Sequence, residues 1–336
     1  MNAADFDNAV AALVAKAGLS VTHPPEQLVG GANNRVFRVH TTGKPALLKA
    51  YFQHPDDKRD RLAAEFSFAT FAWQSGVRCL PRPLACDPKN HLGLFEFVEG
   101  RRLLVTEVDQ DAVKQALDFF NELNRYKDKP TAKALPIASE ACFSIAGHLA
   151  CVERRLQNLR AVEDTAAAAF IRDDLVPRWN TIAGAARTKA TALGLPLEAE
   201  IVASDRCLSP SDFGFHNALL EPTGRLRFMD FEYAGWDDPA KTVCDFFCQP
   251  SLSVSADFYP AVVHAITSGL SQPEAHARRM DLLLPVYRIK WCCILLNDFL
   301  PVGGQRRRFA RSEADQKARQ AQQLENARRA LKEIRS

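Results

Sequence analysis

The chain has 336 residues, of which 47% are hydrophobic and 25% are charged, and its formal net charge is +3 at pH 7. This composition is that of an ordinary soluble globular protein, and the length exceeds the size at which one hydrophobic core stops growing, so two lobes or domains are expected. No apolar run reaches the roughly 18 residues that span a bilayer, and the start of the chain has no signal-peptide pattern, so we expect a cytoplasmic protein without a membrane partner.

The first distinctive element is a predicted hairpin over residues 28–39, which reads LVGGANNRVFRV. Gly30 and Gly31, followed by Asn33 and Asn34, separate two apolar runs. Glycine permits a close approach of backbone to phosphate, and asparagine tolerates left-handed conformations, so this loop is suited to cover the phosphates of a nucleotide. It lacks the GxxxxGK[ST] pattern, which excludes an ordinary P-loop. An ordinary hairpin turn is the alternative reading.

An apolar strand over residues 45–51 follows, with Lys49 embedded in it. A lysine in such a run usually faces solvent or lies at a sheet edge. Residues 61–73, however, have the apolar periodicity of a helix, and Glu65 lies on its apolar side, where a carboxylate needs a cationic partner. We expect Lys49 to be that partner, because kinase folds place an ammonium against the nucleotide phosphates in this way.

The strand and helix patterns predicted along the rest of the sequence divide the chain into two lobes. A further strand is predicted over residues 91–98, which would complete a small nucleotide-covering lobe of residues 1–99. Apolar residues at helical spacing mark a helix at 113–123, and alanine-rich stretches between about 145 and 190 mark others. Residues 100–336 are therefore expected to form a mainly helical catalytic and substrate-binding lobe, interrupted by an active-site loop.

The most informative stretch is residues 210–217, PSDFGFHN, which precedes Asp230 by a short distance. An Asp, an Asn five residues later and a second Asp are the chemical set of a kinase-type phosphoryl-transfer site. The first Asp accepts or orients the attacking hydroxyl, while the Asn and the later Asp hold the metal ions that bridge the nucleotide phosphates. Asp212, Asn217 and Asp230 fit these roles.

Two short strands, 218–220 and 226–229, surround a turn and would return Asp230 to the side of Asn217. The triplet that starts at Asp212 resembles the metal-binding DFG of protein kinases, but its Asn follows it instead of preceding it, so we interpret it as the catalytic loop. Asp and Asn also gather in ordinary turns, and the interpretation therefore depends on the matching upstream half of the chain.

With these residues together, the chain resembles the aminoglycoside phosphotransferase and choline kinase family, from about Leu28 to about Asp245. The resemblance implies an α+β, bilobal protein-kinase-like fold with a small β-rich N-terminal lobe and a larger, mainly helical C-terminal lobe. It also implies ATP or GTP, Mg²⁺, and transfer of the terminal phosphoryl group to a hydroxyl of a small metabolite or an aminoglycoside-like acceptor.

The family pattern H-G-D-x-x-x-x-N matches at Asp212, which the resemblance makes the catalytic base, and at Asn217, which it makes a metal ligand. The family's D-x-[DE] strand end matches residues 230–232, so Asp230 would be the second metal ligand. The chain departs from the pattern at Pro210 and Ser211, where the family usually has His and Gly, and this departure puts the bracing of the loop in doubt.

Further correspondences lie on either side of this loop. The resemblance places Lys49, held by Glu65, on the phosphates. The backbone between Glu96 and Val98 resembles the interlobe hinge that binds adenine. Downstream, Asp237-Asp238-Pro239 and then Asp245, which we expect to open a helix, resemble the element that braces the catalytic loop.

Cysteine and charge patterns add little. The nine cysteines have no framework spacing, which fits a reducing compartment, and no His-rich pattern predicts a zinc site. Residues 303–336 carry ten Lys or Arg against four Asp or Glu. The run Arg306–Arg308 suits nucleic acid, an acidic partner or a substrate phosphate, but a solvated terminal helix is favoured, and the lack of interleaved aromatics makes a nucleic-acid partner unexpected.

The acceptor stays open at this stage. Acidic residues would suit a cationic amine, aromatic residues a quaternary ammonium, and Lys or Arg an acidic sugar. All three kinds occur among the residues expected near the acceptor, which are Trp236, Asp237, Asp238, Tyr287, Lys290, Trp291, Asn297 and Asp298. A nucleotide-binding pseudokinase with a regulatory role is the alternative function, motivated by Pro210, Ser211 and the basic terminal segment, although the retained reactive residues speak against it.

Overall fold

The computed structural model describes residues 3–28, 33–55, 57, 59–301, 305, 309 and 316–334. Gly30 and Gly31 of the predicted phosphate loop lie outside the described residues, and so does the run Arg306–Arg308.

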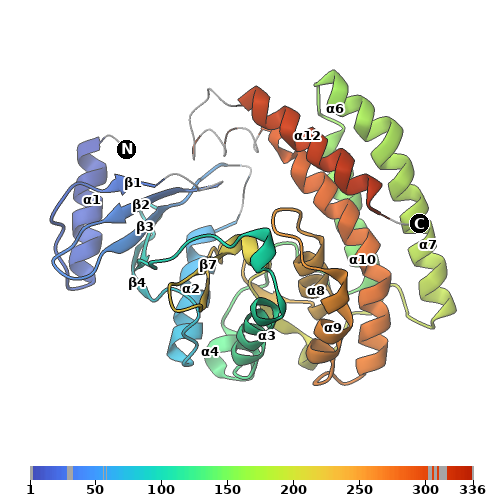
Figure 1. Cartoon of the computed structure of the whole chain (residues 1–336), viewed down its shortest axis with the longest axis horizontal. Coiled ribbons are helices and arrows are strands. Elements are labelled where there is room, and N and C mark those ends of the chain that lie inside the picture. The colour runs from blue at the N-terminus through green and yellow to red at the C-terminus, as the bar shows by residue number, and fades with distance from the viewer. Residues whose placement is uncertain are drawn as a thin grey trace.

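The chain has an α+β fold in which a β-sheet region precedes a mainly helical region (Figure 1). The strands are β1 Glu26–Gln27, β2 Arg35–Val39, β3 Ala46–Ala50, β4 Pro83–Asp87, β5 Leu92–Glu96, β6 Cys207–Ser209, β7 Ala218–Leu220, β8 Leu226–Phe228 and β9 Gly235–Asp237. The helices are α1 Ala3–Lys16, α2 Arg61–Gln74, α3 Gln110–Asn124, α4 Pro130–Lys133, α5 Ile145–Leu159, α6 Thr165–Phe170, α7 Val176–Ala192, α8 Pro239–Cys248, α9 Tyr259–Thr267, α10 Pro273–Leu295 and α12 Gln316–Lys332. None of the described helices is both long enough and apolar enough to cross a membrane.

The N-terminal sheet is antiparallel throughout, with the strand order β1-β2-β3-β5-β4. Helix α1 packs on it through Val10, Leu13 and Val14, which share a core with the sheet residues Phe37 and Leu48. The middle strand β3 has a neighbour on each side, so the position of every side chain along it is fixed by two ladders of backbone hydrogen bonds.

Helix α2 lies between this sheet and the helical region. Its N-cap is Asp60, whose side chain accepts a hydrogen bond of 2.9 Å from the backbone of Ala63. The helix places Glu65 on the same buried face as Phe68 and Ala72, as the sequence predicts. A carboxylate is thereby fixed at the boundary between the sheet and the helices.

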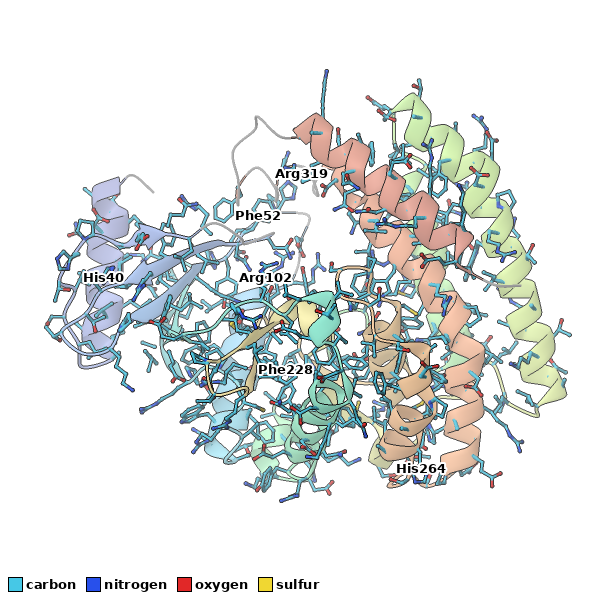
Figure 2. All side chains as sticks on the ribbon, viewed as in Figure 1. His40, Phe52, Arg102, Phe228, His264 and Arg319 are labelled. Atoms are coloured by element: carbon cyan, nitrogen blue, oxygen red, sulfur yellow. The ribbon has the colours of Figure 1, made fainter. Side chains whose placement is uncertain are left out.

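The helical region is organised around α10, which contacts α5, α7, α8 and α12. The described part of the basic terminal segment is mainly α12, which lies along α10 (Figure 1) and buries Leu324 and Ala327. The helix expected at residues 113–123 is α3, whose buried Phe119 stacks on Phe228 of β8 at 4.8 Å between ring centroids. Figure 2 shows Phe228 among the side chains beside α3.

Candidate active site

Aromatic side chains anchor the two segments that carry the predicted reactive groups. Phe213 and Phe215 are buried against Phe246 of α8, and Phe231 packs on Phe68 of α2 at 5.1 Å between ring centroids. Because these phenylalanines are interleaved with polar residues, burying the rings leaves the polar side chains between them to face the opposite side. The polar residues that line the resulting cleft include Asp212, His216, Asn217 and Asp230.

The predicted hairpin is present and has the expected effect. Strands β7 and β8 pair in antiparallel register around a turn that is closed by a 2.9 Å hydrogen bond from Gly224 N to the Glu221 carbonyl. The backbone N–H of Met229 then donates to the carbonyl of Asn217 at 2.8 Å. Asp230 therefore lies beside Asn217, with a φ of 67° that non-glycine residues seldom adopt.

The Asp212 carboxylate is held by its own loop. His216 donates from Nε2 to Oδ1 of Asp212 at 3.2 Å, and the side-chain amide of Asn217 donates to the Asp212 backbone carbonyl at 3.0 Å. Burial would raise the pKa of Asp212, but the facing His216 and Asn217 hold that pKa below its ordinary value. The carboxylate is therefore ionised at neutral pH and able to accept a proton. His216 was not predicted as a site residue, although it follows Asp212 by only four residues in the sequence.

The contact expected between Lys49 and Glu65 is formed, with Nζ–Oε distances of 2.7 and 3.0 Å. The same ammonium donates to Asp230 Oδ1 at 2.9 Å. Burial opposes the charged form of Lys49, but Asp230 and Glu65 together raise its pKa, so the ammonium keeps its charge. Tyr51 also donates to Glu65, at 2.7 Å. The alternation of strand residues, which puts Tyr51 on the same face as Lys49, was the signal that could have predicted this contact.

The second carboxylate of the strand end binds the loop between β1 and β2. Asn33 and Asn34 each donate from Nδ2 to one oxygen of Glu232, both at 2.7 Å. Asn34 also accepts a hydrogen bond from the backbone of Phe52, and Glu232 is only 2% exposed. Both oxygens of Glu232 are thus engaged by the N-terminal region.

A lysine contacts the predicted catalytic loop at Ser211, where the chain departs from the family pattern. Lys241 of α8 donates to Ser211 Oγ at 2.7 Å and to Asp237 at 2.8 Å. Ser211 has a φ of 67° and donates in turn to the carbonyl of Ser139. The Asp237 and Lys241 pair therefore links helix α8 to the backbone just before Asp212.

The hinge residues lie away from this cluster, at the end of β5. The Glu96 backbone N–H donates to the Arg82 carbonyl at 2.8 Å, and its carboxylate pairs with Arg227 at 2.8 Å. Neither Glu96 nor Val98 lines the larger cavity.

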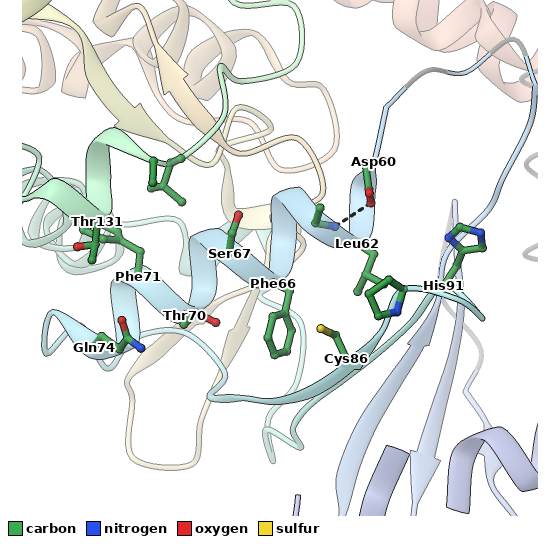
Figure 3. Close-up of a pocket in the computed structure, with 14 residues that line it drawn as sticks. Asp60, Leu62, Phe66, Ser67, Thr70, Phe71, Gln74, Cys86, His91 and Thr131 are labelled. Atoms are coloured by element: carbon green, nitrogen blue, oxygen red, sulfur yellow. Dashed lines mark hydrogen bonds between the residues drawn. The ribbon is translucent and has the colours of Figure 1, made fainter. Parts of the chain in front are cut away.

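Two of the cavities among the described residues differ in size and in lining. The smaller, of about 490 Å³, lies between α2 and β4, where Leu62 and Phe66 point toward Cys86 (Figure 3). Its walls are mainly apolar and bring no set of charged groups together. The larger, of about 1060 Å³, contains the cluster around Asp212 and is the candidate active site.

Only some of the residues that were expected near the acceptor line the larger cavity. Lys290, Trp291 and Asn297 line it. The other five do not, because each is occupied within the helical region, and these are Trp236, Asp237, Asp238, Tyr287 and Asp298.

At helix α8, Asp238 and Asp245 lie differently from what the sequence led us to expect. Asp238 is the N-cap of α8, accepting from the backbone of Ala240 at 2.7 Å, and it also pairs with Arg279 at 2.5 Å. Asp245, which we expected to open a helix, lies inside α8. A run of Asp before Pro is thus a helix start here, which sequence spacing alone did not separate from a substrate-facing group.

The oxygen donors at the site fit Mg²⁺. Asn217 uses Nδ2 as a donor, which leaves its Oδ1 for a cation, and Asp230 gives only Oδ1 to Lys49. In the part of the chain that the structure describes, no three His, Cys, Asp or Glu side chains form a metal cage. A pair of hard oxygen donors suits an ion that completes its shell with phosphate and water, as Mg²⁺ does.

Comparison with known proteins identifies the family. The model of the phosphotransferase enzyme family matches residues 25–279, which is well over half of the chain and includes all the predicted reactive groups. No curated protein matches the sequence.

Solved structures share the fold at low sequence identity. A choline/ethanolamine kinase family protein from Mesorhizobium loti is 19% identical, with a TM-score of 0.61 over 98% of this chain and 95% of that one. A choline kinase from Streptococcus pneumoniae is 14% identical, with a TM-score of 0.55 over 98% of both chains. A spectinomycin phosphotransferase, solved with ADP and its antibiotic, is 12% identical, with a TM-score of 0.57 over 98% of both chains.

Proposed function

Since the chain belongs to the phosphotransferase enzyme family, we propose that it is a small-molecule kinase that transfers the terminal phosphoryl group of ATP or GTP to a hydroxyl of its acceptor. The observation that carries this proposal is the contact of 2.9 Å between Lys49 and Asp230. It joins a strand of the N-terminal sheet to the segment after β8, 181 residues further along the chain. A phosphate-binding ammonium and a metal-binding carboxylate meet in this way in phosphoryl-transfer sites.

Each polar group has a distinct part in the proposed reaction. Asp212 accepts the proton of the acceptor hydroxyl as the hydroxyl oxygen bonds to the terminal phosphorus. The bond from that phosphorus to the bridging oxygen breaks, and the nucleoside diphosphate leaves. Asn217 and Asp230 hold Mg²⁺, which when bound neutralises charge on the phosphates. Lys49, kept in place by Glu65, contributes a further positive charge toward the phosphates.

The nucleotide is proposed to lie under the loop that carries Asn33 and Asn34, with its adenine or guanine base against the backbone between Glu96 and Val98. Gly30 and Gly31 are proposed to approach the phosphates. The division into a nucleotide-covering lobe, 1–99, and a catalytic lobe, 100–336, and the cytoplasmic location remain predictions.

The contacts of the proposed reactive residues do not favour the pseudokinase alternative. A chain released from catalysis need not keep a charged Lys49, an ionised Asp212 and a metal-binding pair. The departure at Ser211 that motivated the alternative is compensated by Lys241.

The test is phosphoryl transfer from labelled ATP or GTP, with Mg²⁺, to a panel of amino alcohols, sugars, hydroxy acids and aminoglycosides. An Asp212→Ala variant is the blank. Labelling of an acceptor by the parent and not by the variant supports the proposal. Nucleotide binding by the parent without transfer to any member of the panel points to the regulatory alternative.

A further inference from the structure

The larger cavity is lined by equal numbers of cationic and anionic side chains. Five cationic side chains line the cavity, namely Arg59, Arg155, Lys241, Lys290 and Arg319, and five carboxylates do so, namely Asp57, Glu140, Asp212, Asp230 and Asp245. Two of the carboxylates, Asp212 and Asp230, are committed to the proposed proton transfer and metal binding. Three carboxylates therefore remain. The five cations also have carboxylate partners, since Arg59 pairs with Asp57, Arg155 with Glu140, Lys241 and Lys290 with Asp245, and Arg319 with Asp298.

Those three carboxylates are already used by the protein. Asp57 pairs with Arg59 at 2.6 Å, and Glu140 pairs with Arg155. Asp245 accepts from Lys290 at 2.9 and 3.0 Å and also from the indole of Trp291 at 2.9 Å. None of the three is left to bind the ammonium of an amino alcohol or an aminoglycoside without breaking an internal ion pair.

The charged pairs also set the local potential. Although burial opposes the effect, the nearby Arg155, Lys290 and Lys241 lower the pKa of Glu140 to about 2. The Glu140 carboxylate therefore lies beside several cations, an environment that favours an anion over a cation.

The aromatic side chains do not form a cage for a quaternary ammonium. Among the described residues, Trp291 and Tyr233 are the Trp, Tyr or Phe side chains that line the cavity. Two guanidinium groups already lie over the Tyr233 ring. Their central carbons are 5.4 Å (Arg59) and 5.9 Å (Arg61) from the ring centroid. A single remaining ring does not surround a cation as aromatic cages do.

Two of the arginines that line the cavity are partly exposed. Arg155 of α5 and Arg319 of α12 each direct one nitrogen to a carboxylate, Glu140 and Asp298 respectively. Their side chains are 18% and 17% exposed, whereas Lys241 is almost fully buried. Figure 2 shows Arg319 at the end of α12 that lies nearer the N-terminal sheet. A guanidinium has five N–H donors in a fork that matches a carboxylate or a phosphate.

We propose that the acceptor is an anionic hydroxyl compound, whose carboxylate or phosphate group is bound by Arg155 and Arg319 while its hydroxyl faces Asp212. This inference rests on the proposed kinase function and names the chemical class of its substrate. Neutral side chains in the same cavity, among them Asn158, Asn297 and Gln323, supply hydrogen bonds for further hydroxyl groups.

The test uses three matched polyols that differ at one carbon: gluconate with a carboxylate, sorbitol with a hydroxyl and glucamine with an ammonium. Glycerol 3-phosphate serves as the phosphate arm. Thermal unfolding of the full chain is followed with saturating Mg-ADP, so that the nucleotide's own phosphate contacts are occupied. We expect gluconate, glycerol 3-phosphate or both to raise the melting temperature, and glucamine and sorbitol to leave it unchanged. Whichever anion acts identifies the preferred acid group.

Arginine variants distinguish binding of the anion inside the cavity from a general effect of positive charge on the protein. Arg155→Gln, or Arg319→Gln if the first variant fails to fold, should weaken the apparent affinity for the active anion about tenfold or more. Arg154→Gln on the same helix is the matched control, because Arg154 is exposed and does not line the cavity. Stabilisation by glucamine or sorbitol, no effect of either anion, or an anion effect that survives in both cavity variants would overturn the proposal. Failure of Mg-ADP itself to stabilise the parent would count instead against the kinase function.

Discussion

Asn34 donates a hydrogen bond of 2.7 Å to Glu232, although 198 residues separate them in the sequence. Glu232 follows the proposed metal ligand Asp230 by two residues, and Asn34 belongs to the predicted phosphate loop. Since Asn33 binds the other oxygen of the same carboxylate, one side chain fixes the end of the loop relative to the metal site. Arg61 of α2 lies 3.5 Å from Glu232, so a cation also faces this buried carboxylate.

Glu232→Gln should weaken nucleotide binding. The substitution replaces one acceptor oxygen with an NH₂ group that faces an asparagine donor, and a buried unsatisfied donor costs about 1–3 kcal/mol, so Mg-nucleotide affinity should fall about tenfold. Titration of parent and variant with Mg-ATP or Mg-GTP measures this. Glu99→Gln, at an exposed carboxylate near the same sheet, is the control. Equal affinities in all three proteins would show that this contact does not position the loop.

We expect Asp212→Ala to lower the rate of phosphoryl transfer and Asp230→Ala to lower the affinity for Mg-nucleotide. Loss of Asp212 removes a general base, worth about 10²–10⁴ in rate, and should leave nucleotide affinity nearly intact. Loss of Asp230 removes a metal ligand and a partner of Lys49, so Mg-nucleotide affinity itself should fall. Paired transfer assays and nucleotide titrations measure both quantities. A loss of binding that is the same in the two variants would contradict the assigned roles.

Local spacing explains why much of the fold could be predicted. The Glu65 position follows from helix periodicity, and the return of Asp230 follows from a short hairpin with a turn between its strands. The α+β fold and the family were predicted on these residues and are confirmed by the family match and the solved structures. Each of these features depends on residues close together in the sequence or on a recognisable pattern.

The parts that could not be predicted depend on which distant partner a polar residue meets. Nothing near Asp238 indicates that it pairs with Arg279, and nothing near Glu232 indicates Asn33. Of the residues expected near the acceptor, Lys290 lines the larger cavity, whereas Asp238 does not. Sequence identifies a polar group, but whether protein or ligand satisfies it is decided by tertiary packing.

Gly235→Ala should destabilise the protein. A Cβ at Gly235 would lie 2.2 Å from the Pro136 carbonyl oxygen, which is backbone and cannot rotate away. Such overpacking costs about 1–3 kcal/mol or more. The control is Gly184→Ala in α7, where a Cβ meets nothing within 4 Å and alanine should stabilise the helix by about 0.5–1 kcal/mol. Denaturant unfolding of the three proteins should therefore give changes of opposite sign, and a stable Gly235→Ala protein would contradict the close packing of β9.

We expect the buried His148 to make the free energy of unfolding decrease as the pH falls. Its imidazole is buried, with Nε2 3.2 Å from Asp238 and Nδ1 2.7 Å from the Tyr287 hydroxyl. A neutral ring that donates from Nε2 and accepts at Nδ1 satisfies both partners. Burial lowers the pKa of His148 despite the opposing effect of Asp238, and the nearby cations Arg279 and Lys290 act in the same direction as burial.

The sign of the pH effect follows from proton binding. The unfolded chain takes up a proton on His148 below a pH of about 6.5, whereas the folded protein does so only at lower pH, so the free energy of unfolding falls as the pH drops through this range. In a His148→Gln variant the side chain can still donate and accept but does not titrate. Denaturant unfolding at pH 7.5 and 5.5 should therefore show a parent advantage over the variant that shrinks at the lower pH. An advantage that grows instead would mean that Asp238 outweighs burial and that His148 is folded in its charged form.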